Sequence, residues 1–153
     1  MTSTEIALLI NNDAEKINRI GEIIGKKITE KDNFNNLNEF EKTFIYLDVL
    51  EQNVTDGGFI QFFFNSSGQF THEIFQAYLA IKAENTVDIL TKAIYLFPEI
   101  PVPKNLQIRQ QILMKKDSNI DLWDELDTEF YKYEDNIILL TLAYVRNNIA
   151  HFD

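Results

Sequence analysis

Residues 53–68 read NVTDGGFIQFFFNSSG, and this stretch decides how the chain folds. Gly57-Gly58 is expected to end the helix before it, because Asp56-Gly57 suits a C-terminal cap at which glycine takes a positive φ at little cost. Residues 59–65 form a short aromatic helical piece, and Ser66-Ser67-Gly68 breaks the chain a second time. The stretch therefore predicts an aromatic helical piece between two breaks.

Two helices are predicted on the N-terminal side of this stretch. Residues 5–28 place apolar side chains on one stripe at helical spacing, with Asp13 as the single intruder. Residues 29–36 are polar and rich in asparagine, which is typical of a loop. Residues 37–55 carry apolar side chains around most of a second helix, which is therefore expected in the core. Its narrow polar wedge consists of Glu41, Asp48 and Gln52.

Five further helices are predicted on the C-terminal side. They are expected at residues 71–83, 85–97, 105–115, 120–133 and 136–151. All three prolines, Pro98, Pro101 and Pro103, lie in one linker, which they keep extended. The last helix is apolar nearly all round and is expected to be buried. No segment shows the period-two alternation of strands, so the sequence predicts an all-α fold, a single compact domain of seven or eight helices over residues 1–153.

The composition excludes several classes of chemistry. The chain of 153 residues contains no cysteine, which rules out disulfides, thiolate zinc sites and cysteine nucleophiles. Its two histidines, His72 and His151, lie far apart, and no motif supplies the several ligands that a metal site needs. No run approaches the roughly 18 apolar residues of a membrane helix. We therefore expect no metal, no cofactor, no catalytic site, no membrane partner and a cytoplasmic location.

The formal net charge is −10, and it is unevenly distributed along the chain. Residues 117–153 carry nine acids and two bases, whereas residues 57–116 carry four acids and six bases. A negative field repels nucleic acid and anionic membranes and attracts basic proteins. The charge therefore favours a basic protein partner over direct nucleic-acid binding, although acidity also serves solubility alone.

The helix predicted at residues 120–133 is the segment in which charge has a defined geometry. Its acids fall opposite the side formed by Trp123, Leu126 and Phe130, with Asp127 near the boundary. Carboxylates three and four residues apart lie about 5–6 Å from each other, which is the order of the spacing between phosphates along a nucleic-acid strand. This face is interpreted either as a partner-binding surface or as a solvated outer face. The predicted acidic surface consists of Asp117, Asp121, Asp124, Glu125, Glu129, Glu134 and Asp135, with Glu41 and Asp48 as further members.

Residues 53–68 resemble the signature of the DNA-mimic protein family, whose pattern is N-G-G-F-x-Q-[FY]-F-x-N-S-x-G. The matching residues are Gly57, Gly58, Phe59, Gln61, Phe62, Phe63, Asn65, Ser66 and Gly68. Segments 89–90, 96–98 and 126–131 also fit, whereas Asp56 stands where the family usually has asparagine. The resemblance covers about residues 37–147 and leaves the N-terminal helix, within residues 1–30, outside it.

The resemblance implies an acidic all-α protein that imitates double-stranded DNA and sequesters a helix-turn-helix repressor. The signature itself is interpreted as structural: its glycines turn the chain, its aromatic rings fill the core, and Gln61 and Asn65 hydrogen-bond buried backbone groups. The leading prediction is thus a DNA mimic that occupies the DNA-binding site of a basic DNA-binding protein, a regulator.

Two other functions fit the same residues. An immunity or antitoxin-type protein could block a basic toxin with the same acidic surface. A small carboxylate-dependent hydrolase is the third alternative, and a closed, carboxylate-lined pocket would favour it. The apolar stripe of residues 5–28 either covers the chain's own core or packs on a second copy, so a homodimer is a further alternative.

Overall fold

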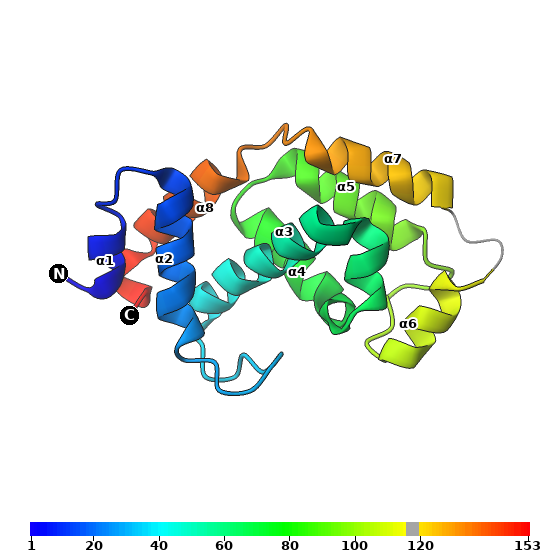
Figure 1. Ribbon diagram of the computed structural model, residues 1–153, viewed down its shortest axis with the longest axis horizontal. Helices are drawn as coiled ribbons and strands as arrows, with labels where there is room; N and C mark the ends of the chain where they lie inside the picture. Colours follow the sequence, from blue (N-terminus) through cyan, green and yellow to red (C-terminus); the bar gives the residue numbers. More distant parts are fainter. Residues whose placement is uncertain (116–119) are drawn as a thin grey trace.

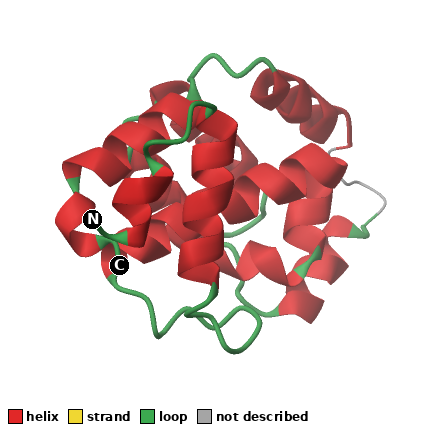
Figure 2. Ribbon diagram, turned by 60° about the vertical axis from the view of Figure 1, so that its left-hand side comes forward, coloured by secondary structure: helices red, strands yellow, loops and turns green. Residues whose placement is uncertain are grey.

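The computed structural model describes residues 1–115 and 120–153. In these residues it contains eight α-helices, two short 3-10 helices and no strand (Figure 2). The predicted all-α fold of seven or eight helices is therefore confirmed. The organisation of the whole chain as a single domain stays a prediction.

Two helices form where the sequence predicted one over residues 5–28. α1 (Ser3–Ala7) and α2 (Asp13–Gly25) are separated by a turn. The Asn12 side chain accepts a hydrogen bond from the Glu15 backbone N–H at 3.0 Å and so starts α2 anew. The prediction of one continuous helix was wrong, because an apolar stripe shows which face is buried but not where a polar cap interrupts the backbone.

α3 (Glu39–Phe64) is a long helix with a kink. It starts with a capping box, in which the Asn38 side chain accepts from the Glu41 N–H and the Glu41 side chain accepts from the Asn38 N–H. At Gly57 and Gly58 the backbone leaves helical geometry, with φ of −154° and 77° respectively. The break thus lies where the sequence predicted it, but the residue with positive φ is Gly58 rather than Gly57.

The remaining elements follow α3 in the chain. They are η1 (Ser66–Phe70), α4 (Thr71–Ala80), α5 (Glu84–Tyr95), α6 (Leu106–Leu113), α7 (Ile120–Tyr131), α8 (Ile137–Asn147) and η2 (Ile149–His151). α3 contacts α4, α6 and α7, and α5 contacts both α4 and α7 (Figure 1). At the other end of the molecule α2 packs on α8 (Figure 1).

Aromatic side chains from the kinked end of α3 fill the core beneath α7. Phe59, Phe62 and Phe63 are fully buried. The Phe63 ring centroid lies 4.8 Å from that of Phe97 and 5.4 Å from that of Trp123. Burying such large apolar rings is a main source of folding free energy. The predicted core role of these aromatic residues is therefore confirmed.

α8 lies at the surface, although its sequence is apolar nearly all round. Ile137, Leu142 and Val145 are buried, whereas Ile138 and Leu139 are 39% and 50% exposed. The prediction of a fully buried last helix was wrong, because α8 buries one face, which packs on α2.

The two ends of the chain meet beside α1. The Asp153 carboxylate accepts hydrogen bonds from the backbone N–H groups of Ser3 at 2.7 Å and Thr4 at 3.2 Å, and from the Thr4 hydroxyl. These bonds satisfy N–H groups in the first turn of α1, which have no helical partner. Both ends therefore lie at the opposite end of the molecule from α7 (Figure 1).

Candidate acidic interface

α7 presents three acidic side chains on its outer face. Asp121, Asp124 and Glu125 are exposed, and none of them forms an ion pair within the described residues. The opposite face packs into the core through Trp123, Leu126 and Phe130. The structure thus separates a charged from a buried face of α7. Asp117, the predicted member before this helix, lies outside the described residues.

Asp127 anchors α7 to the kink of α3. Its Oδ1 accepts a hydrogen bond from the Phe59 backbone N–H at 2.8 Å, so this carboxylate caps the helix that restarts after Gly58. Burial raises the pKa of Asp127, an effect that the Phe59 N–H opposes and the charge of Asp124 increases. A Cβ at Gly58 would lie 2.3 Å from Asp127 Oδ2. Gly58 is therefore required both by its positive φ and by this close approach.

A buried guanidinium holds the end of α3. The Arg109 side chain is fully buried and donates to the backbone carbonyl oxygens of Phe63 at 2.9 Å and Asn65 at 2.7 Å. Carbonyl groups at a helix C-terminus lack helical N–H partners and favour positive charge. A Cβ at Gly68 would lie 2.6 Å from Arg109 Nε, so the close approach of Arg109 leaves no room for a side chain at position 68. Sequence reasoning missed Arg109 because its partners lie 46 and 44 residues away in the chain.

The amide side chains of Gln61 and Asn65 do not have the role that the sequence predicted. Gln61 donates to the Asp56 side chain at 2.9 Å across the kink, rather than to a buried backbone group. The Asn65 side chain forms no cap hydrogen bond at the start of η1. The backbone carbonyl of Phe62 instead accepts from the buried Ser67 hydroxyl at 2.7 Å.

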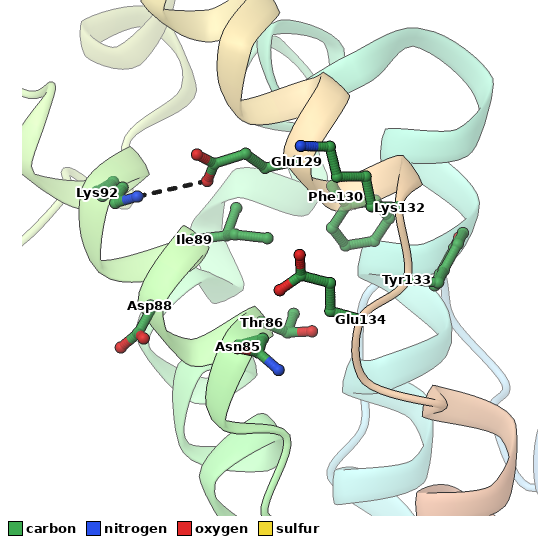
Figure 3. A pocket seen from close by; sticks show the side chains of 10 residues that line it. All are labelled: Asn85, Thr86, Asp88, Ile89, Lys92, Glu129, Phe130, Lys132, Tyr133 and Glu134. Carbon is green, nitrogen blue, oxygen red and sulfur yellow. Dashed lines mark hydrogen bonds and ion pairs between the residues drawn. The ribbon is translucent and has the colours of Figure 1, made fainter.

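Glu129 and Glu134 lie beside a surface cavity of about 200 Å³ between α5 and α7 (Figure 3). Lys92 donates to Glu129 Oε2 at 3.4 Å, and Lys132 lines the same cavity. Figure 3 shows the Glu134 side chain reaching toward α5. Basic side chains therefore reduce the negative field at this edge of α7.

Two predicted members of the acidic surface have structural roles instead. Glu41 is only 3% exposed and forms an ion pair with Lys27, in addition to capping α3. Asp135 is half-buried and accepts from the Thr86 backbone N–H at 2.8 Å and the Asn85 side-chain amide at 3.0 Å, which caps α5. Placing Glu41 on an exposed surface was wrong, and the carboxylate of Asp135 is occupied by α5. The ion pair of Glu41 and the cap that Asp135 forms depend on contacts with other segments, which helical periodicity does not reveal, whereas the capping box of α3 is local.

Asp48 lies close to a carboxyl group that sequence reasoning missed, Glu51. Glu51 Oε2 accepts a hydrogen bond from the buried Tyr78 hydroxyl at 2.6 Å. Burial raises the pKa of Glu51 to about 7, the hydroxyls of Tyr78 and Tyr133 oppose this rise, and the charge of Asp48 adds to it. Burial also raises the pKa of Asp48, against a hydrogen bond from Gln52. The one sequence signal for this pair was two acids three residues apart in a helix expected to be buried.

These features define a class of protein, a small acidic all-α protein whose α7 carries exposed acids without ion-pair partners among the described residues. Within residues 1–115 and 120–153, no three side chains suited to metal binding come together. Over the same residues, no helix combines the length and the apolar character needed to cross a bilayer.

The chain belongs to the DMP19-like protein family, whose model matches residues 35–148. The match is consistent with the resemblance to DNA-mimic proteins. It covers α3 to α8, and α1 and α2 lie outside it. Neither a curated protein nor a solved structure matches the chain.

Proposed function

We propose that this protein is a DNA mimic whose acidic α7 face occupies the DNA-binding site of a basic regulator. The observation that carries the proposal is the exposure of Asp121, Asp124 and Glu125 without an ion-pair partner among the described residues. Membership of the DMP19-like family supports the same function. The proposed surface has these three acids at its centre, with Glu129 and Glu134 at its edge beside α5.

The charge spacing on α7 supports this function. Like charges three or four residues apart destabilise a helix by about 0.2–0.5 kcal/mol per pair. α7 retains these repulsive acids, and no described lysine neutralises Asp121, Asp124 or Glu125. The destabilised helix therefore keeps a negative field that is available to a partner. DNA-binding surfaces are built to neutralise phosphates, so such a face competes with DNA for them.

The attachment of α7 to the core supports the mimicry in a second way. Asp127 fixes the middle of the helix to α3, and the buried Trp123 and Phe130 fix its inner side. A surface that is ordered before binding loses little conformational entropy in the complex. α7 therefore offers its carboxylates at a fixed spacing, as a duplex offers its phosphates.

A paired capture experiment tests the proposal. The wild-type protein and the Asp121→Asn/Asp124→Asn/Glu125→Gln variant serve as baits in a lysate at low salt. The protein retained only by wild type is purified, and its complex with a DNA duplex is challenged with wild type in a gel-shift assay. We expect wild type to displace the duplex, and the displacement to weaken steeply with salt because salt screens exposed charges.

Two results would contradict the proposal. One is a captured protein that binds the variant as tightly as wild type. The other is binding that stays constant as the ionic strength rises severalfold.

The experiment also decides between the alternative functions. A captured basic toxin that binds no DNA, and that the wild-type protein inhibits, would replace the mimic with an immunity-type inhibitor. A catalytic role has less support, because the cavities beside Asp48 and Glu51 are open to solvent rather than closed around a substrate. We therefore propose a binding protein and no enzyme.

A further inference from the structure

A groove beside the C-terminal end of α7 adds a second feature to the acidic interface. Three cavities, of about 190, 340 and 660 Å³, all have Glu51 in their walls. Their other walls come from α2, α3, α8 and the link between α7 and α8. The three cavities therefore adjoin at one carboxyl group, and together they are called the Glu51 groove below.

The Glu51 groove combines an apolar floor with acidic walls. Ile17, Leu47 and Ile138 line the cavity of about 190 Å³. The other acids along its walls are Asp48, Asp56 and Asp135. No lysine or arginine of the described segments lines any of the three cavities. The groove therefore has the apolar surface and the charge that complement a cation carried on an aliphatic stem.

In the part of the chain that the structure describes, every titratable group that faces Glu51 is either a tyrosine or another acid. Tyr78 on α4 donates to Glu51, and Tyr133 faces it from the link after α7. The acids are Asp48 and Asp56 on α3 and Asp135 on the link. α2 and α8 contribute no titratable side chain to the groove. Burial, together with the charge of Asp48, makes an ionised Glu51 costly until a positive charge enters, in agreement with its raised pKa of about 7.

We propose that the Glu51 groove receives one arginine side chain of the basic partner, with the guanidinium on the Glu51 carboxylate and the stem along Leu47 and Ile138. This inference rests on the proposed function, because it adds a pocket for a partner side chain to the acidic face. A guanidinium is more weakly hydrated than an ammonium group and pairs with a carboxylate through two parallel hydrogen bonds. Arginine therefore suits a half-buried carboxylate better than lysine does.

Occupation of the groove is coupled to the release of a proton. In the free protein a carboxyl group with a pKa of about 7 is half protonated near neutral pH. A guanidinium in contact with it favours the carboxylate, so the proton passes to solvent as the cation binds. Affinity for the cation therefore rises with pH up to the pKa of free Glu51 and levels off above it.

The test uses n-butylguanidinium as a probe for the arginine side chain, with the full chain labelled with carbon-13 at glutamate carboxyl groups. We expect the probe to move the NMR titration midpoint of Glu51 to lower pH. Glu51→Gln, whose amide oxygen can still accept from Tyr78, should weaken probe binding about tenfold or more, because a charge-assisted hydrogen bond is lost. Asp88→Asn alters an exposed acid at the separate cavity between α5 and α7 and should leave the affinity unchanged.

A neutral analogue supplies the second comparison. n-Butylurea has the same stem without the charge and should bind at least about tenfold more weakly than the probe. A Glu51 midpoint that does not move, or equal affinities for the two compounds, would overturn the assignment.

The partner itself supplies the last measurement. Glu51→Gln should weaken binding of the captured regulator, and an unchanged affinity would show that the regulator leaves the groove empty. The probe experiment needs no protein partner. Its failure is therefore distinguishable from failure of the α7 face, which competition with DNA tests separately.

Discussion

α2 and α7 are both amphipathic helices with acids on their outer faces, yet their acids have different surroundings. In α2, Lys16 lies 2.8 Å from Asp13 and Arg19 lies 3.3 Å from Glu22. In α7, the single ion pair among the described residues is that of Glu129. Amphipathic periodicity therefore reports which face of a helix is buried, whereas the placement of bases decides whether the outer face carries a field.

The same difference recurs between two carboxyl groups of α3. Glu41, near the end of α2, has Lys27 as its ion-pair partner. Glu51, near the end of α7, has the hydroxyls of Tyr78 and Tyr133 beside it and no ion-pair partner among the described residues. Asp13, Glu22 and Glu41 thus each have a base beside them, whereas Asp121, Asp124 and Glu125 have none among the described residues. Four predictions test this contrast.

The largest effect is expected from the glycine that attaches α7 to α3. Gly58→Ala places a Cβ 2.3 Å from Asp127 and forces alanine to a φ of 77°. We expect it to lower the free energy of unfolding by about 3 kcal/mol. The matched variant in α2 is Gly25→Ala, which meets no atom within 4 Å and should be neutral or stabilising by up to about 1 kcal/mol. Urea denaturation measures the free energy of unfolding of both variants. Equal destabilisation would contradict the claim that Gly58 is needed to attach α7 to α3.

Next in size is the effect of charge on partner binding. The Asp121→Asn/Asp124→Asn/Glu125→Gln variant should bind the captured regulator up to about a hundredfold more weakly, since each exposed ion pair contributes about 0.2–1 kcal/mol. Glu15→Gln/Glu22→Gln in α2 removes charge from a face that we do not assign to the partner, and should leave the affinity nearly unchanged. Titration calorimetry at low salt compares them, and similar losses would indicate a diffuse effect of net charge.

A smaller effect is expected in the pH dependence of stability. The pKa of Glu51 in the folded protein is about 7 against 4.5 for the exposed group, so the folded state binds this proton more tightly than the unfolded chain. Its stabilisation is therefore fully present below pH 4.5 and is lost as the pH rises through 7. Wild type should lose on the order of 2 kcal/mol relative to Glu51→Gln over this range. Denaturation curves at several pH values measure the difference in the free energy of unfolding between wild type and Glu51→Gln. A difference that does not change with pH would contradict the raised pKa of Glu51.

The smallest effect has opposite signs in the two helices. Glu125 lies four residues from both Asp121 and Glu129, so Glu125→Gln should stabilise the fold by about 0.5 kcal/mol. Glu22→Gln removes an exposed pair with Arg19 and should destabilise it by about 0.3 kcal/mol. Thermal unfolding detects both changes. A loss of stability in both variants would show that the acids of α7 do not repel one another in the folded protein.

The sequence predicted those features that arise within one helix. The repeats of apolar residues located most helices, and the period of α7 separated its acids from Trp123 and its neighbours. The double glycine located the kink of α3. In each case the signal and the structure lie within a few residues of one another.

The features that the sequence did not predict depend on segments far apart in the chain. Glu41 is buried and forms an ion pair with Lys27, and Asp135 accepts a hydrogen bond from the first turn of α5. Arg109 and Glu51 have their roles through carbonyl and hydroxyl groups on other elements. The sequence alone does not distinguish a polar residue that faces solvent from one that contacts a distant segment of the chain.

The hydrogen bonds of Asp153 to Ser3 and Thr4 place both chain ends at the side of the molecule remote from α7 (Figure 1). An affinity tag, a fluorophore or a surface tether fused at either end is therefore held away from the acidic helix. In a biosensor, the protein immobilised through one end would present α7 outward to the analyte. An extension after residue 153 leaves the aspartate side chain free to keep the first helix capped.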